Sequence, residues 1–137
     1  MDRSKHANII KYIVDNLNNT DYFVARLVYL LYSDKYCMTN DDGKDKWFVF
    51  NDNHWRTSAS IKHDLKNKLS EEVTQFISDA RLKIKNDALN VTEDHSFIER
   101  RIINLIKIEK SLYNTTYKDR ILKECESHFF VNELPNH

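Results

Sequence analysis

The side chains best suited to contact a ligand surround Trp55, inside the stretch Lys46 to Thr57 that holds both tryptophans of the chain. Exposed aromatic rings can stack on the bases of single-stranded nucleic acid, while neighbouring cations bind its phosphates. Arg56 adjoins Trp55, and Lys62 and Lys66 follow one turn apart on the next expected helix. Trp55, Arg56, Lys62 and Lys66 are therefore the candidate nucleic-acid-binding residues, with single-stranded nucleic acid as the ligand.

The two tryptophans also have a structural interpretation, which we favour. Successive side chains of a β-strand point to opposite faces of a sheet, so Trp47 would point to one face and Phe48 to the other. One face then packs against helices, and a tryptophan on that face belongs to the core. Arg56, at the exit of the hairpin, is the residue of this stretch that we expect to be exposed.

Other basic residues belong to stretches of mixed charge. Lys46 and His54 flank the tryptophans and could also meet phosphates. Further basic pairs lie one or two helical turns apart on later segments: Arg81 with Lys85, and Arg100 with Lys107. Acidic residues are interspersed among them, which is typical of a solvated helix face. We favour that interpretation over a stripe that tracks phosphates.

Several kinds of catalytic site lack the residues they need. A phosphate-binding loop needs glycines that free successive backbone amides, and Gly43 is the only glycine. The six histidines form no cluster with zinc-like spacing, and the expected strands carry no paired acidic residues for two-metal chemistry. His128 follows Cys125 and could activate its thiolate, but Cys125 lies on an apolar stripe and is expected in the core. We predict no catalytic residue, no metal site and no cofactor.

Helices are expected to fill most of the chain, because Gly43 and Pro135 are its only glycine and proline. Apolar residues recur at helical spacing in five segments. These predict a first helix ending near Asn18-Asn19, a buried second helix capped by Thr20 or Asp21, a long helix from Ser58 or Ser60, a fourth capped by Thr92 or Asp94, and a last capped by Thr115 or Thr116. Ser70 could cap a fresh helix, which would kink the long one.

Three short aromatic and β-branched runs predict a meander, at Tyr36 to Thr39, Trp47 to Phe50 and His54 to Thr57. Asp42-Gly43 favours a tight turn because glycine tolerates a positive φ. The acidic residues around this turn lack the ligand spacing of an EF-hand. The predicted fold class is mainly α, with about five helices and a small three-stranded antiparallel β-meander, in a single domain over residues 1–137.

The overall charge is balanced, with 21 basic and 21 acidic residues. No global field recruits nucleic acid or an anionic membrane, so binding would need a local patch. The longest apolar stretch, Tyr22 to Tyr32, is interrupted by Arg26 and too short to span a bilayer. Cys37 and Cys125 are expected to be reduced thiols. We expect a soluble intracellular protein.

These segments together resemble a known family. Trp47 to Asn51 and His54 to Arg56, followed by a long helix with Leu65, Leu69 and Ser70, resemble the domain that precedes the superfamily-three helicase module in poxvirus-type helicase-primases of large DNA viruses and phages. The early apolar helix and the tyrosine-containing strand fit the same pattern, and Phe129 to Leu134 resembles the approach to the helicase core. The resemblance covers roughly residues 20 to 134, and its distinctive motif is the tryptophan hairpin.

The resemblance implies a longer parent protein, with a primase domain before this region and a hexameric helicase ATPase after it. It implies a non-catalytic linker or collar domain that couples primase to helicase during viral DNA replication, helps the hexamer assemble and guides the DNA strand. The implied partners are the flanking primase and helicase domains, single-stranded DNA and further copies of the parent. The implied location is the host cytoplasm or a viral replication site. The alternative is a protein-interaction or oligomerisation module without nucleic-acid contact.

Overall fold

The computed structural model describes residues 1–90 and 94–136. In these residues the helices are α1 (Arg3–Asn16), α2 (Asp21–Tyr32), α3 (Ile61–Lys68), α4 (Thr74–Asp87), α5 (His95–Ser111) and α6 (Thr115–Phe129), and the strands are β1 (Tyr36–Asp41), β2 (Lys44–Asn51) and β3 (His54–Arg56). A π-helical turn, Leu69–Val73, joins α3 to α4, and a short 3-10 turn, Ala88–Asn90, follows α4. The predicted fold class, mainly α with a three-stranded antiparallel meander, is confirmed.

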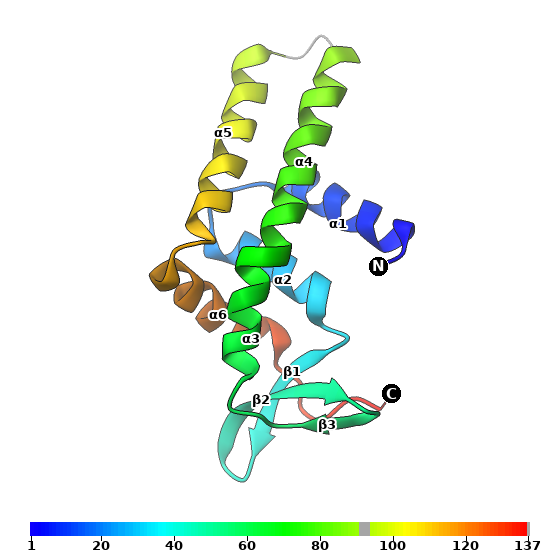
Figure 1. Ribbon diagram of the computed structural model, residues 1–137, viewed down its shortest axis with the longest axis vertical. Helices are drawn as coiled ribbons and strands as arrows, with labels where there is room; N and C mark the ends of the chain where they lie inside the picture. Colours follow the sequence, from blue (N-terminus) through cyan, green and yellow to red (C-terminus); the bar gives the residue numbers. More distant parts are fainter. Residues whose placement is uncertain (91–93, 137) are drawn as a thin grey trace.

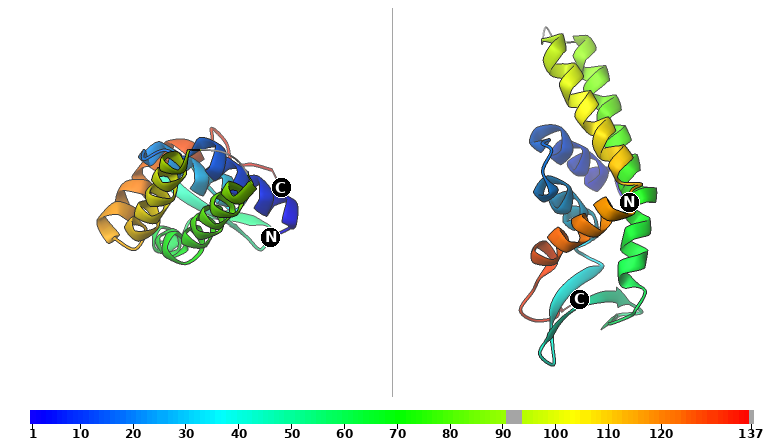
Figure 2. Two further views of the ribbon diagram at one scale, coloured as in Figure 1. Left: turned by 90° about the horizontal axis from the view of Figure 1, so that it is seen from above. Right: turned by 90° about the vertical axis from the view of Figure 1, so that its left-hand side faces the viewer.

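The combined helix α3–α4 runs from the sheet to the opposite end of the molecule, and α5 returns beside its second half (Figure 1). The helices α1, α2 and α6 lie together on one side of it, as the side view shows (Figure 2). α2 is buried along most of its length, which confirms its predicted place at the centre, although Tyr22 at its start is exposed. Among the described residues, no helix is long and apolar enough to cross a bilayer.

The caps of α2 and α5 follow the prediction. The hydroxyl of Thr20 accepts the amide N–H of Phe23 at 3.1 Å, and the carboxylate of Asp94 accepts the amide N–H of Ser96 at 3.0 Å. Each side chain satisfies an amide that the first helical turn leaves without a backbone partner. Thr92, the other candidate cap of α5, lies outside the described residues.

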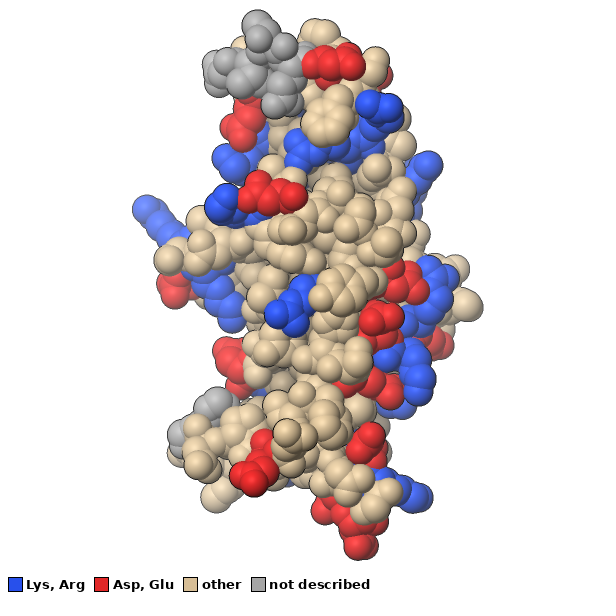
Figure 3. All heavy atoms as spheres, turned by 180° about the vertical axis from the view of Figure 1, so that it is seen from behind, with Lys and Arg blue, Asp and Glu red and all other residues tan. Residues whose placement is uncertain are grey.

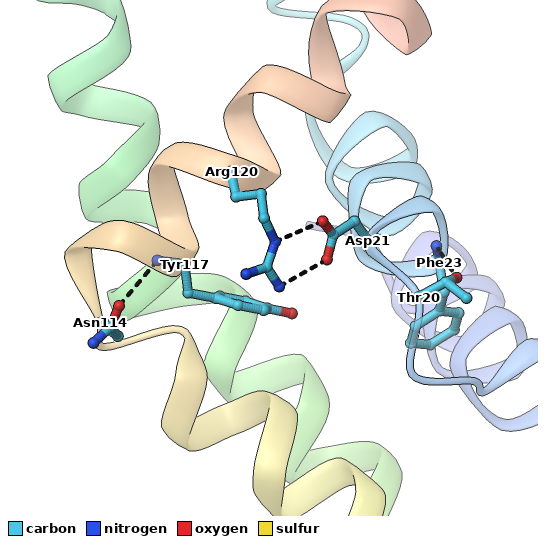
Figure 4. A network of polar contacts seen from close by, with 6 residues as sticks. All are labelled: Thr20, Asp21, Phe23, Asn114, Tyr117 and Arg120. Atoms are coloured by element: carbon cyan, nitrogen blue, oxygen red, sulfur yellow. Dashed lines mark hydrogen bonds and ion pairs between the residues drawn. The ribbon is translucent and has the colours of Figure 1, made fainter.

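The cap of α6 differs from the prediction. Asn114 precedes the helix in an extended conformation, and its side-chain carbonyl accepts the amide N–H of Tyr117 at 2.9 Å (Figure 4). The cap is therefore neither of the two predicted threonines, because both already have helical backbone geometry. One turn later, Arg120 donates two hydrogen bonds to Asp21, at 2.7 and 3.0 Å, which join α6 to the start of α2.

The interruption of the long helix is a π-helical turn and not a new helix start. The hydroxyl of Thr74 donates to the carbonyl of Ser70 at 2.7 Å, which satisfies a carbonyl inside this turn. The hydroxyl of Ser70 donates to the carbonyl of Leu112 at 2.9 Å and accepts from the ammonium of Lys118 at 2.9 Å. Ser70 is therefore not a cap; its side chain bonds the long helix to the corner between α5 and α6.

The three strands pair in the order β1-β2-β3, and both connections are two-residue turns. Asp42 and Gly43 have φ angles of 54° and 86°, and Asp52 and Asn53 have φ angles of 53° and 65°. Two successive positive φ angles match the twist of the flanking strands, and Gly, Asn and Asp adopt them most readily. The meander prediction is confirmed, with β1 and β2 longer than expected because the first turn is so short.

Trp47 anchors the sheet to the helices. It lies opposite Met38 of β1, and only 6% of its surface is exposed. Its ring meets that of Phe129 edge to face, with centroids 5.2 Å apart. Phe129, 1% exposed, also meets the ring of Tyr29 on α2 edge to face at 5.3 Å. The structural interpretation of Trp47 is confirmed.

The chain after α6 packs against the sheet. The amide of Val131 donates to the carbonyl of Met38 at 2.8 Å, and Phe130 forms a parallel bridge with Met38. Farther along, the carbonyl of Pro135 accepts the indole N–H of Trp55 at 2.9 Å. The tail therefore connects β1, one edge strand, with β3, the other.

We expect Phe129→Ala to lower the free energy of unfolding by about 3–5 kcal/mol, because it removes the ring that joins Trp47 to Tyr29. Phe97→Ala is the matched control: this ring on α5 is 47% exposed, and its loss should change the stability by less than about 0.5 kcal/mol. Urea denaturation followed by circular dichroism measures both. Equal losses for the two variants would contradict the central role of Phe129.

Candidate nucleic-acid interface

A groove runs between α3, α6 and the beginning of β2. Its larger hollow, about 590 Å³, is lined by Asp45–Trp47 of β2, by the loop Thr57–Ala59 and by residues of both helices. A second hollow of about 470 Å³ continues between α3 and α6. Four residues line both hollows: Ala59, Lys62, Lys123 and Glu126. We call the two hollows together the α3–α6 groove.

Four lysines line the α3–α6 groove: Lys46 of β2, Lys62 and Lys66 of α3, and Lys123 of α6. Three of them have a carboxylate partner: Lys66 with Asp119 at 2.7 Å, Lys46 with Asp41 at 3.2 Å, and Lys123 with Glu126 at 3.3 Å. Lys62 forms no ion pair or hydrogen bond with any residue that the structure describes. Lys62 is therefore the groove lysine without an anionic partner among the described residues, while the carboxylate of Asp45, which lines the larger hollow, accepts a hydrogen bond from Asn40.

Two of the four predicted contact residues lie together in this groove. Lys62 and Lys66 are one turn apart on α3, and both line the hollow that faces α6. Their shared direction follows from helical spacing, as the sequence predicts. The ammonium of Lys66 is held 2.7 Å from Asp119, so binding a phosphate there would exchange one anion for another.

The other two predicted residues, Trp55 and Arg56, lie on the edge strand β3 and do not line the groove. Arg56 turns back toward the β2–β3 turn, with its guanidinium 3.4 Å from the carbonyl of Asn51 and 3.8 Å from the carboxylate of Asp52. Trp55 is half-buried, and its ring lies 5.2 Å from that of Phe50. The hairpin exit and the first turns of α3 are thus two separate surfaces.

Lys123 is the groove residue that sequence reasoning missed. Its side chain is 79% exposed, and it follows the buried pair Ile121 and Leu122 on α6. The periodicity of α6 marks Lys123 as solvent-facing but carries no information about which other helix faces it. Only the packing of α6 beside α3 brings it to Lys62.

The cysteines are buried and carry no activated thiolate. Cys125 is fully buried on α6, and burial raises the pKa of its thiol. The imidazole of His128 lies 3.4 Å from the carboxylate of Glu124 and is thereby directed to that group. The expectation of a core cysteine is confirmed. Cys37 is also buried, and burial raises the pKa of its thiol to about 11.

Within residues 1–90 and 94–136, no group of three or more His, Cys, Asp or Glu side chains has an arrangement that could hold a metal ion. The acidic turn around Gly43 is built from hydrogen bonds: the amide of Asn40 donates to Asp45 at 3.3 Å, and the backbone N–H of Gly43 donates to the carbonyl of Asn40's side chain at 3.3 Å. This agrees with the interpretation of the segment as a turn.

Comparison of the sequence with protein-family models and with curated proteins finds no match.

We expect neither thiol of the folded protein to react appreciably with an aromatic disulfide reagent at about pH 8, because the thiolate is the reactive form. With its pKa raised to about 11, Cys37 should react faster as the pH is raised toward that value. Both thiols should react at once in denaturant. Rapid release of one equivalent of chromophore from the folded protein at neutral pH would contradict the burial of these residues.

Proposed function

We propose that this chain is a non-catalytic accessory domain of a DNA-replication helicase-primase of the poxvirus type, and that its α3–α6 groove contacts single-stranded DNA. The resemblance of the tryptophan hairpin and the following helix to that family supports the first part. The gathering of four lysines from β2, α3 and α6, with Lys62 in no ion pair with a described residue, supports the second. The linker role, coupling a primase domain to a helicase domain, comes with the family.

The groove suits a phosphate chain better than a compact ligand. It is open, it extends over two adjoining hollows, and its cations come from three separate elements. Phosphates that enter would pair with Lys62 directly and would compete with Glu126 for Lys123, which is highly exposed. Each contact of this kind displaces a condensed counterion from the strand, so the proposed binding is salt-dependent; it is weak because the contacts are few.

A second candidate function is protein interaction without nucleic-acid contact. The hairpin of α4 and α5 projects beyond the other helices (Figure 1). It carries exposed apolar side chains on both helices: Leu82, Phe97 and Ile103. A hollow of about 530 Å³ between the two helices is lined in part by Leu82, Ile102 and Ile106. Apolar side chains in such a position are suited to contact with a flanking domain.

We expect labelled single-stranded DNA to bind at about 50 mM salt and much more weakly at about 200 mM. Lys62→Ala combined with Lys123→Ala should weaken binding irrespective of sequence. It should also reduce the slope of log K against log salt by about 1–1.5 units, the loss of two phosphate contacts on a single strand. Fluorescence anisotropy over a salt series measures both quantities.

The matched control is Lys11→Ala with Lys83→Ala, which removes the same charge from two exposed lysines paired within their own helices. Its binding should equal that of the wild type. Arg56→Ala tests the hairpin exit separately. Absence of binding at low salt, or equal binding by the groove variant and the control, would defeat the DNA contact. Association of a DNA-silent chain with a flanking domain would then favour the second candidate.

A further inference from the structure

Arg26 is a half-buried cation with no carboxylate partner in the described part of the chain. It lies on α2, whose one other charged residue is Asp21, with its guanidinium carbon 4.7 Å from the centre of the Tyr29 ring. It forms no hydrogen bond or ion pair with any of the described residues. Burial raises the pKa of Tyr12 and the charge of Arg26 opposes that shift, so the guanidinium is also close to the Tyr12 phenol. A guanidinium with five N–H donors is thus left to bind an anion from outside.

Aromatic side chains surround this arginine. Tyr22, one turn before it on α2, is 60% exposed, and its ring lies 4.8 Å from that of His128 on α6. We give the name α2–α6 surface to five residues: Tyr12, Tyr22, Arg26, Tyr29 and His128. α1, α2 and α6 lie on the side of the molecule seen in Figure 3, whose centre carries few charged side chains. The cores of protein–protein interfaces are rich in tyrosine and arginine and poor in other charged residues, and this surface has the same composition.

The same surface carries a carboxylate that pairs with no lysine or arginine among the described residues. Glu124 precedes His128 by one turn on α6, and its carboxylate lies 3.4 Å from the imidazole. It is 38% exposed, whereas the His128 side chain is 4% exposed beneath Tyr22. The contact between the Tyr22 and His128 rings therefore brings together, on one surface, Arg26 of α2 and Glu124 of α6, each one turn from a member of this pair.

This arrangement decides between possible partners. A nucleic-acid strand needs several cations along its path, and this surface has one. In a two-fold symmetric dimer, the same surface of both copies forms the contact. That surface must therefore carry both the cation and the anion of each charge pair. We propose that a second copy of this chain docks on the α2–α6 surface, with Arg26 of each copy pairing with Glu124 of the other across the tyrosines. This inference goes beyond the proposed function and does not depend on DNA contact.

The test is a charge swap followed by sedimentation velocity. Wild-type protein should form dimers as its concentration rises toward about 200 μM. In the dimer, residue 26 of each copy faces residue 124 of the other, so each single variant, Arg26→Glu or Glu124→Arg, creates two contacts between like charges. Each should raise the dimer dissociation constant at least roughly tenfold. Arg26→Glu with Glu124→Arg restores opposite charges and should recover most of the association.

Lys83→Glu reverses an exposed charge on α4, far along the chain from this surface, and should leave association unchanged. Circular dichroism checks that each variant is folded; if Arg26→Glu is not, Arg26→Gln and Tyr22→Ser replace it and should both weaken the dimer. A wild-type protein that stays monomeric over the whole range would overturn the proposal. So would single variants that associate like the wild type, or a double variant that does not recover.

Discussion

The packing of Phe129 holds the parts of this molecule together. It is the last residue of α6, and its buried ring meets Tyr29 of α2 and Trp47 of β2 at nearly equal distances, 5.3 and 5.2 Å. Edge-to-face contacts of this kind fix orientation as well as burying apolar area. Three elements far apart in the sequence, α2, β2 and α6, thereby share one point. The tail that leaves this point then pairs with β1, so the sheet cannot shift without disturbing the helical core.

The π-helical turn at Leu69–Val73 divides the long helix into two parts that pack against different helices. Before it, α3 faces α6 and forms one wall of the groove; after it, α4 faces α1 and α5. Polar contacts hold the turn from two sides. Ser70 bonds the α5–α6 corner, and on another side the hydroxyl of Tyr32 donates to the carboxylate of Glu72 at 2.7 Å. Burial, together with this hydrogen bond and the charge of Glu72, raises the pKa of Tyr32, so the phenol stays a donor at all physiological pH values.

The helix α6 connects the two surfaces for which we propose roles. Lys123 and Glu126 face the groove beside α3, while Glu124 and His128 belong to the surface shared with α2. Between these two sides, Ile121, Cys125 and Phe129 are buried, so the buried face of α6 separates them. The two proposals use different charges of one helix, so we expect variants of one surface to leave the other intact. A chain of zero net charge can then present local cations on one side and a self-complementary patch on another.

The sequence by itself determined the order of helices and strands, because apolar spacing and turn residues act over short range. Asp42-Gly43 and Asp52-Asn53 specify the two hairpin turns, and Thr20 specifies the start of α2. Asn114 and the two threonines that follow it are all suited to cap α6. The sequence alone does not show that Asn114 is the one with the extended backbone that precedes the helix. Lys62 and Lys66 could be placed on one helix face from spacing alone. That Lys123 joins them, that Arg56 does not, and that Tyr22 of α2 meets His128 of α6 was decided only by the tertiary structure. Helical periodicity indicates which side of a helix is buried, whereas the packing of the whole core determines which other helix lies against that side.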